Sequence, residues 1–597
     1  MNLLTLPRGQ HGEMDNDPSR RLDRVLGALL ARLDGGAVPT IGPVTALLSQ
    51  RRQEGHVCLD LRDASSATLL PAGFSLEELR KSRLVGAPGE FKPLILDGAD
   101  RLYLHQLYQD ECALARAILQ RAAQPPCTLE AEAFRAACEF HLGARSPGPD
   151  GMDRTRIAAY LALTRTLALV TGGPGTGKTW LAGRILGMGI SLGVFAPHRV
   201  ALAAPTGKAA ARLDEMIRPN LDDAARAQLP GARTLHRLLG VSADGRRTRH
   251  HARFPLDCDV LVVDETSMAD QRMLSLLFDA CPPHARILLL GDPGQLAPVE
   301  AGSILADLAA CSRDYPNDVQ GHIEAATGES LPPADDKGPL ADCRVHLNVN
   351  HRFRECPGLS ELAAGIREGR SGDVRGKLGE GSLTGVTWEP KPLTAAGIAA
   401  ILAPFQEAFG RACAAETPAK AHAELSRAKI LCALRQGPWG APAINERLEA
   451  RLRSAGLAEA GDWYRGRPVM VTRNDYALGL FNGDLGVAWP DDEGRRCVWF
   501  AGADAKGAMR AFDPSRLPAH ETAYALTIHK SQGSEFDEVL VLLPEGADSM
   551  MTREMAYTAV TRARRKVTLV ASAELLAAAI ETPTRRAGGL AEALRRA

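Results

Sequence analysis

The sequence predicts an α/β protein with two successive series of strands and helices. In the first series, short apolar runs alternate with helical segments, as is typical of a parallel sheet covered on both faces. These runs lie at 166–172, 201–207, 259–265 and 285–292. A second series begins near residue 343 and includes apolar runs at 428–434, 536–544 and 565–572.

The domain boundaries follow from changes in this pattern. Residues 1–145 form a mostly helical N-terminal region, which ends in the turn-rich "SPGPDG". Residues 146–345 and 346–597 hold the two α/β series, and the second contains a turn-rich β segment at about 462–520. An "NGD" flanked by apolar residues there is typical of a hairpin, so we expect a small β-barrel-like insertion.

Two segments are each open to two interpretations. The polar composition of residues 312–342 indicates an exposed insertion or a mobile loop. It is either a specialised element near a ligand or partner, or a tolerated insertion. The stretch "RLYLHQLYQ" (101–109) belongs either to a core or to a partner-binding face.

Composition and charge narrow the class of protein. The 71 basic residues balance the 71 acidic ones, so any nucleic-acid groove must be local. The twelve cysteines form no CxxC pair, which fits a reducing compartment. The first residues lack the apolar core of a signal peptide, and no apolar stretch approaches the roughly 20 residues that span a bilayer. We therefore expect a soluble protein of the cytoplasm, away from membranes.

The segment "VTGGPGTGKTW" (170–180) predicts a nucleotide site. Gly172, Gly173, Pro174, Gly175, Thr176 and Gly177 would turn backbone N–H groups toward phosphate oxygens. Lys178 supplies a positive charge to the β- and γ-phosphates, and Thr179 is a candidate ligand for Mg²⁺. The alternative is a glycine-rich surface turn.

Two later strand ends complete this site. The run "DVLVVDE" ends in Asp264, a candidate Mg²⁺ ligand, and Glu265, a candidate general base for the attacking water. In "GDPGQLAPV", the amide of Gln295 is placed to sense the γ-phosphate. Each of these strand ends could alternatively be a plain turn.

Seven sequence blocks occur in one order along the chain. They are "APTGKAAARL" (204–213), "RTLHRLLG" (233–240), "DETSM", "GDPGQLAPV", "NHRF" (350–353), "TIHKSQGSEFDEV" (527–539) and "YTAVTRARR" (557–565). The set resembles the motif series of superfamily 1B helicases. Segments outside the motor, such as "GHVCLDL" (55–61), resemble the RecD family, the α subunits of exonuclease V. The resemblance implies two RecA-like P-loop NTPase domains, a helical N-terminal domain and a small SH3-like β-rich insertion.

The resemblance also implies roles for individual residues. Arg352 and Arg562 match the arginines that complete the nucleotide site from the second domain, and Glu535 matches the position that touches the ribose. The neighbouring Arg564 and Arg565 are expected at the surface. Thr155 stands where relatives often carry a glutamine that reads adenine, which leaves the choice of nucleotide open.

Single-stranded DNA is expected to cross both motor domains. The candidate contacts that match the family are Thr206, Lys208, Thr234 and His236 in the first domain, and Thr527, His529, Lys530 and Ser531 in the second. Contacts of this kind to the DNA backbone predict little sequence preference and a strong dependence on salt.

The implied function is that of an ATP- and Mg²⁺-dependent 5′–3′ DNA helicase. It would act on single strands and double-stranded ends as one subunit of a RecBCD-type heterotrimer with RecB-like and RecC-like chains, in recombination and repair. The sequence shows no nuclease pattern, so cutting would belong to the RecB-like partner. Two alternatives remain: a stand-alone RecD-like helicase, and an ATP-gated regulatory or scaffold subunit that binds DNA ends.

Overall fold

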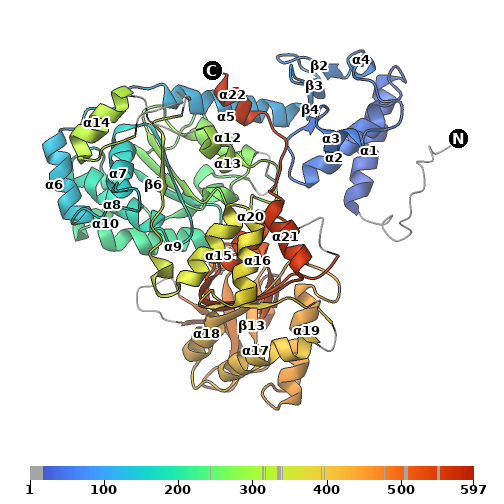
Figure 1. The fold of residues 1–597 in the computed structure, drawn as a ribbon, viewed down its shortest axis with the longest axis vertical. Coiled ribbons are helices and arrows are strands. Elements are labelled where there is room, and N and C mark those ends of the chain that lie inside the picture. Colours follow the sequence, from blue (N-terminus) through green and yellow to red (C-terminus); the bar gives the residue numbers. More distant parts are fainter. Residues whose placement is uncertain are drawn as a thin grey trace.

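The computed structural model describes residues 18–242, 244–245, 247–311, 315, 317–332, 338, 340–391, 393–394, 397–475, 477–502, 509–546 and 551–596. In these ranges the chain forms two parallel sheets, an antiparallel sheet and a small mixed sheet. Figure 1 shows the teal and green region of the first parallel sheet above the yellow, orange and red region of the second, with the blue N-terminal region to one side. None of the helices in these ranges is long and apolar enough to cross a membrane.

The first parallel sheet has the strand order β10-β5-β9-β8-β6-β7. Its strands are β5 (Leu167–Gly172), β6 (Val200–Ala204), β7 (Arg233–Thr234), β8 (Val260–Val263), β9 (Arg286–Gly291) and β10 (Arg344–Leu347). All neighbouring strands are parallel, so their carboxyl ends lie along one edge. The apolar runs expected as strands in this half are confirmed as β5, β6, β8 and β9.

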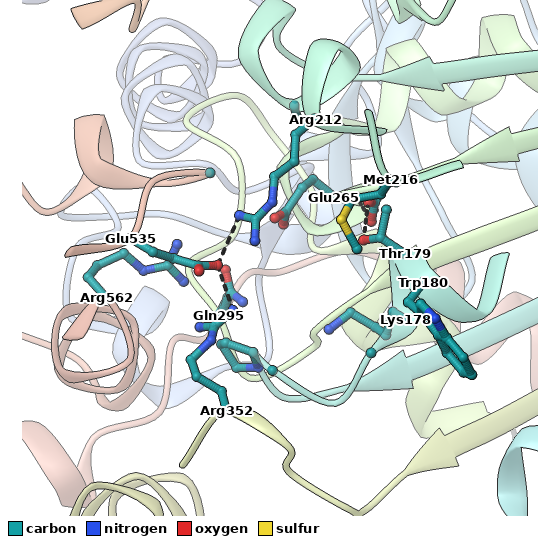
Figure 2. A pocket seen from close by; sticks show the side chains of 16 residues that line it. Lys178, Thr179, Trp180, Arg212, Met216, Glu265, Gln295, Arg352, Glu535 and Arg562 are labelled. Carbon is teal, nitrogen blue, oxygen red and sulfur yellow. Dashed lines mark hydrogen bonds and ion pairs between the residues drawn. The ribbon is translucent and has the colours of Figure 1, made fainter. Parts of the chain in front are cut away.

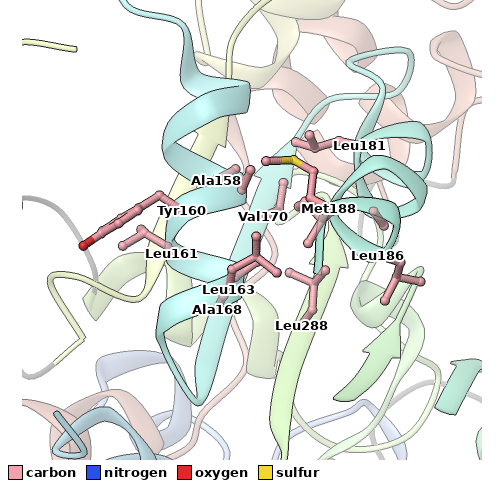
Figure 3. Packing of buried hydrophobic residues seen from close by; sticks show 14 of the residues in the cluster. Ala158, Tyr160, Leu161, Leu163, Ala168, Val170, Leu181, Leu186, Met188 and Leu288 are labelled. Atoms are coloured by element: carbon pink, nitrogen blue, oxygen red, sulfur yellow. The ribbon is translucent and has the colours of Figure 1, made fainter. Parts of the chain in front are cut away.

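Alternate residues of β5 pack into cores on opposite faces of this sheet, as the pleat requires. Ala168 and Val170 pack with α6 (Ala131–Leu142), α7 (Arg154–Thr164) and α8 (Lys178–Ser191), and Figure 3 shows this layer. Leu167 and Leu169 pack on the other face. The helices of that face are α5 (His105–Ala122), α11 (Leu235–Leu239), α12 (Gln271–Ala280) and α13 (Ile304–Cys311).

Shorter elements connect these strands. They are η1 (Pro197–Arg199), α9 (Gly207–Ile217), η2 (Arg218–Asn220), α10 (Asp223–Gln228) and η3 (Thr266–Met268). Helix α9 follows β6 directly, so its N-terminus lies at the carboxyl edge of the sheet, where the ligand-binding loops of such folds gather.

The expectation of an exposed insertion or loop over 312–342 is wrong for its described middle part. Residues 317–327 form α14 (Asn317–Thr327), whose Val319, Ile323 and Ala326 are buried in the first core. Their i, i+4, i+7 spacing is a helical apolar stripe that the polar overall composition concealed. The segment's residues 312–314, 316, 333–337 and 339 lie outside the described ranges.

The second parallel sheet has the strand order β11-β20-β19-β12-β18. Its strands are β11 (Val386–Glu389), β12 (Ala428–Cys432), β18 (Ala525–Thr527), β19 (Phe536–Leu542) and β20 (Ala563–Val570). One face is covered by η4 (Arg352–Glu355), α15 (Pro357–Arg367), α16 (Ser371–Glu380), α20 (Arg553–Val560) and α21 (Ala573–Glu581). The other is covered by α17 (Gly397–Cys413), α18 (Pro418–Arg427) and α19 (Ala441–Ser454).

The expected β-rich insertion is present between α19 and β18. It is an antiparallel sheet of order β16-β15-β14-β13-β17 with its own small core. The elements are β13 (Pro468–Val471), β14 (Leu485–Pro490), β15 (Arg496–Ala501), β16 (Met509–Phe512), η5 (Pro514–Arg516) and β17 (His520–Thr522). The "NGD" turn lies in the connection from β13 to β14, and Gly483 there has a φ of +94°.

The N-terminal region combines helices with short strands. It contains α1 (Pro18–Asp34), α2 (Ile41–Gln53), β1 (Leu59–Asp60), α3 (Ala64–Ala67), α4 (Leu76–Leu79), β2 (Val85–Gly86), β3 (Leu94–Leu96) and β4 (Arg101–Leu104). Its sheet has the order β1-β4-β3-β2. Strands of two to four residues are too short to show an alternating pattern, which is why the sequence indicated only helices.

Helices from both ends of the chain pack on the first parallel sheet. Helices α5 and α6 precede residue 145 yet join the two cores of that sheet. After the last elements of the second sheet, the chain returns to the first sheet and forms the C-terminal helix α22 (Leu590–Arg595), at the top of Figure 1. Leu590 and Leu594 of this helix are buried, and the helix packs against α5 and α13. The boundaries expected at 145 and 345 remain predictions, but these helices belong with the first sheet.

A candidate nucleotide site between two sheets

The phosphate loop connects the carboxyl end of β5 to the N-terminus of α8. Gly175 and Gly177 both have a φ of +82°, a left-handed conformation that glycine adopts without strain. The loop also touches the second half of the chain. Asn350 Nδ2 donates to Pro174 O at 2.8 Å, and His351 N donates to Gly175 O at 2.9 Å. The "NHRF" block therefore holds the loop from the opposite side.

Lys178 and Thr179 begin α8, as the motif requires. Lys178 Nζ donates to Gly172 O at 2.7 Å and to Gly173 O at 3.0 Å, so the ammonium lies over the loop. Thr179 Oγ1 donates to Asp264 Oδ2 at 2.7 Å. The structure thus brings together the two residues predicted to share Mg²⁺.

Glu265 follows β8 in an uncommon backbone conformation. Its φ of +51° lies in the left-handed region, which costs a non-glycine residue energy and often marks functional positions. Burial and the neighbouring Asp264 raise the pKa of Glu265, although Arg562, Lys178 and Arg212 oppose that shift. A carboxylate with a raised pKa is a better proton acceptor, as a general base needs to be.

The loop after β9 links the two parallel sheets. Gln295 is buried beside Asp292, which accepts from its amide at 3.4 Å. Asp292 Oδ2 also accepts from Tyr557 Oη of α20 at 3.0 Å, and Leu296 N donates to Thr558 Oγ1 at 3.0 Å. The sequence indicated Gln295 but not the Asp292–Tyr557 contact, although both residues lie within recognised blocks.

One cavity of about 210 Å³ collects most of the predicted nucleotide-site residues. Its lining includes Lys178, Thr179, Asp264, Glu265 and Gln295 from the first sheet, and Arg352, Glu535 and Arg562 from the second half of the chain. Arg562 is 3% exposed and donates to Thr558 O and Ser534 O. Both predicted arginines therefore line the same cavity as the phosphate loop (Figure 2), and Arg352 lies against Gly175 of that loop.

Glu535 is surrounded by guanidinium groups. Its Oε1 accepts from Arg352 Nη2 at 2.6 Å and from Arg212 Nη1 at 2.9 Å, and its Oε2 lies 3.4 Å from Arg564. Burial alone would raise its pKa, but Arg352 and Arg212 lower the pKa of Glu535 to about 2. In this structure Glu535, the residue predicted to touch the ribose, instead binds arginine side chains. Its contact with a ribose remains a prediction.

Sequence reasoning missed Arg212. It lies on α9 within the quoted "APTGKAAARL", and no family role had been attached to it. Trp180 and Met216 also line the cavity without having been predicted. The exposed positions of Arg564 and Arg565 agree with the expectation for them.

Thr155, which stands where relatives often carry an adenine-reading glutamine, makes a helix-capping interaction. Thr155 lies in the first turn of α7, and both its N and its Oγ1 donate to Asp153 Oδ1 at 3.1 and 2.5 Å. Thr155 does not belong to the lining of the cavity. The choice of nucleotide base therefore stays open.

The DNA candidates of the first domain cap helices. Thr206 Oγ1 accepts from Ala209 N at 3.2 Å at the start of α9, and Thr234 Oγ1 accepts from Arg237 N at 3.3 Å at the start of α11. His236 is exposed. Lys208 instead donates to Ser534 Oγ at 2.7 Å, and burial lowers its pKa.

The DNA candidates of the second domain follow β18. Thr527 and Lys530 line a cavity of about 450 Å³, and Lys530 pairs with Glu521 at 2.6 Å. Burial lowers the pKa of His529. Ser531 is fully buried and donates to Ile528 O at 2.7 Å, so the predicted DNA contact of its side chain is not supported here.

These features define the class of protein: a P-loop NTPase motor with two parallel sheets and arginines supplied by the second. Family models agree with this class. Residues 155–301 match an AAA domain, residues 522–570 match the UvrD-like helicase C-terminal domain, and residues 17–103 match the N-terminal domain of RecBCD enzyme subunit RecD.

Whole-chain relatives give the family. RecBCD enzyme subunit RecD of Mycolicibacterium smegmatis is 36% identical, over 92% of this chain and 93% of that protein. The subunit of Haemophilus influenzae is 32% identical, over 83% and 80%. The ATP-dependent RecD2 DNA helicase of Deinococcus radiodurans is 30% identical, over 78% of this chain but 54% of that protein. The chain belongs to the RecD family of superfamily 1 helicases.

A solved structure has a more distant likeness. Bacteroides Pif1 bound to single-stranded DNA is 17% identical and covers 70% of this chain and 91% of its own, with a TM-score of 0.38.

Proposed function

We propose that this chain is the RecD subunit of a RecBCD-type enzyme and works there as an ATP-dependent 5′–3′ DNA helicase. It would unwind double-stranded ends for break repair by homologous recombination. The observation that carries the motor is one cavity lined by Lys178 and Glu265 from one sheet and by Arg352 and Arg562 from the other. The direction of movement rests on the family resemblance.

In the proposed reaction, Glu265 accepts the proton of a water that attacks the γ-phosphorus of ATP. The bond to the β–γ bridging oxygen breaks, and ADP carries away the released charge. Lys178, Arg352 and Arg562 stabilise the negative charge of the transferring phosphoryl group. Since the two arginines come from the second sheet, hydrolysis requires the cleft to close.

The residues at the loop suit Mg²⁺ that arrives with the nucleotide. Thr179 and Asp264 provide a hydroxyl and a carboxylate 2.7 Å apart, a donor pair that leaves the other positions to phosphates and water. Within the described ranges, no group of three or more His, Cys, Asp or Glu side chains could hold a metal by itself. When bound, Mg²⁺ would neutralise charge on the β- and γ-phosphates.

Movement along DNA follows from the same closure. Thr206 and His236 lie on the first domain, whereas Thr527 and Lys530 lie on the second. A strand held by both groups is displaced when one domain moves relative to the other. Backbone contacts of this kind give binding that weakens steeply with salt.

The N-terminal region offers a surface for the RecC-like partner. Leu22, Val25, Leu29 and Leu33 of α1 are 61%, 57%, 40% and 45% exposed. Their i, i+3, i+7, i+11 spacing forms one apolar stripe, separate from the face with the buried Gly27 and Leu30, of which Gly27 packs on α2. Exposed stripes of this kind mark interaction sites. The "RLYLHQLYQ" segment, by contrast, buries Leu102 and Tyr103 completely, which favours a core role for it.

Co-expression with the RecB-like and RecC-like chains of the same genome tests the proposal. We expect a stable heterotrimer whose single-strand-stimulated ATPase falls when Lys178→Gln is introduced into this chain. Leu29→Asp should weaken assembly without lowering the ATPase of the free chain. Efficient unwinding by the chain alone would favour a stand-alone helicase, and assembly without any ATPase would favour a scaffold subunit.

A further inference from the structure

The Glu535 carboxylate is shared by arginines from both sides of the cleft. Arg352 and Glu535 belong to the second half of the chain, whereas Arg212 lies on α9 of the first. Both guanidinium groups donate to the same oxygen, Oε1, at 2.6 and 2.9 Å. Figure 2 shows them reaching the carboxylate from different sides. Because both guanidinium groups donate to one oxygen, Glu535 binds each arginine less strongly when the other is also bound.

Arg352 is not fully paired in this arrangement. Its side chain is 15% exposed, and its Nη1 is buried without an acceptor among the described residues. A buried donor without a partner costs free energy, so Arg352 gains when another acceptor, such as a phosphate oxygen, comes within reach. The Arg212 side chain is 43% exposed, so it is less confined by its surroundings than Arg352.

The contact between Arg212 on α9 and Glu535 depends on closure of the cleft. Lys208 and Arg212 are four residues apart and so lie on one face of the helix. Lys208 contacts Ser534, and Arg212 contacts the next residue, Glu535. Two neighbouring contacts thus dock α9 on the second domain, and opening of the cleft would withdraw both.

We propose that Arg212 is a positioning residue that releases the arginine finger Arg352 when the cleft closes. In the open cleft, Glu535 holds Arg352 without competition. In the closed cleft, as in this structure, Arg212 and Arg352 share the carboxylate, so Glu535 holds Arg352 less strongly, and Arg352 turns to the γ-phosphate once nucleotide is bound. The inference rests on the proposed ATPase function. It also links DNA binding to hydrolysis, because α9 carries Arg212 and begins at the predicted DNA contacts Thr206 and Lys208.

The test uses four versions of the full chain: wild type, Arg212→Gln, Glu535→Gln and the double variant. Single-strand-stimulated ATPase is measured for kcat and KM, and folding is checked by thermal melting. We expect Arg212→Gln to lower kcat about tenfold, a size common for coupling between sites, with KM nearly unchanged. Glu535→Gln should restore most of that loss in the double variant, because no carboxylate then retains Arg352.

Two comparisons keep the test sharp. Arg212→Lys keeps the charge and should lose less activity than Arg212→Gln. Arg226→Gln removes a surface pair with Asp223 and hydrogen bonds to the carbonyls of Arg218 and Leu221 in the same domain. Because it lies away from the cavity, it should leave kcat within about twofold of wild type. A kcat defect of Arg212→Gln that persists unchanged in the Glu535→Gln background would overturn the inference. Absence of ATPase in wild type would instead overturn the proposed function.

Discussion

The first parallel sheet ends in acidic, hydroxyl and lysine side chains, whereas the second half of the chain presents guanidinium groups to the same cavity. Lys178, Thr179 and Glu265 follow strands of the first sheet. Arg352 and Arg562 flank elements of the second, and Arg562 is almost completely buried. We therefore expect the first sheet to hold the phosphates and Lys178 to meet part of the charge that hydrolysis develops, whereas Arg352 and Arg562 from the second half of the chain complete its stabilisation.

The largest effect expected from this difference belongs to the second sheet. Arg562→Ala should lower kcat by about 10³- to 10⁵-fold, because an arginine finger stabilises the transferring phosphoryl group. Nucleotide binding, measured with a fluorescent analogue, should change little. The exposed Arg565→Ala, three residues further along the chain on β20, is the matched control. Loss of nucleotide affinity equal to the loss of kcat would remove the distinction between the two sheets.

A smaller loss is expected on the first sheet. Glu265→Gln removes the proposed general base, which typically contributes about 10²- to 10⁴-fold to kcat. The amide preserves the volume of the side chain, so melting should stay near wild type. ATPase and nucleotide binding are measured on the same preparation. A Glu265→Gln enzyme with wild-type kcat would show that another group accepts the proton.

The pH dependence sharpens the role of the same residue. Glu265 must be ionised to accept a proton, and burial together with Asp264 raises its pKa. The acid limb of kcat/KM should therefore begin at a higher pH than for an ordinary glutamate, with activity falling as pH decreases. Glu535, with a pKa lowered to about 2, stays ionised over this range and cannot produce the limb. An acid limb that persists in Glu265→Gln would contradict the assignment.

The smallest effect concerns the contact between the two sheets. Tyr557→Phe removes the hydroxyl that donates to Asp292 at 3.0 Å. A hydrogen bond to a charged group is worth about 1.5–3 kcal/mol, so closure should weaken by roughly tenfold at the lower end. Fluorescence energy transfer between labels on the two domains would report the closed population. An unchanged population would show that other contacts determine closure.

Much of the site could be predicted because its residues are near one another in sequence or follow predicted strands. The loop from Gly172 to Thr179 joins strand β5 to helix α8. Asp264 and Glu265 directly follow strand β8, which is separated from β5 by one strand in the sheet. Arg352 and Arg562 came only from the family resemblance, since nothing local in "NHRF" or "TRARR" shows which arginine faces inward.

The features that sequence reasoning missed depend on packing between distant segments. Arg212 faces Glu535, 323 residues away, and Asp292 meets Tyr557, 265 residues away. Helix α14 was hidden by the polar residues around its buried stripe. The motif predicts that Ser531 contacts DNA at the surface. The turn in which Ser531 lies instead directs its hydroxyl to Ile528 O.

A structure of the chain with ADP and aluminium fluoride, a mimic of the transferring phosphoryl group, tests the central claim most directly. The account predicts that Arg352 and Arg562 both contact the fluoride, with Arg352 turned away from Glu535 and Arg212 still in contact with that carboxylate. A closed cleft in which neither guanidinium reaches the fluoride would contradict it.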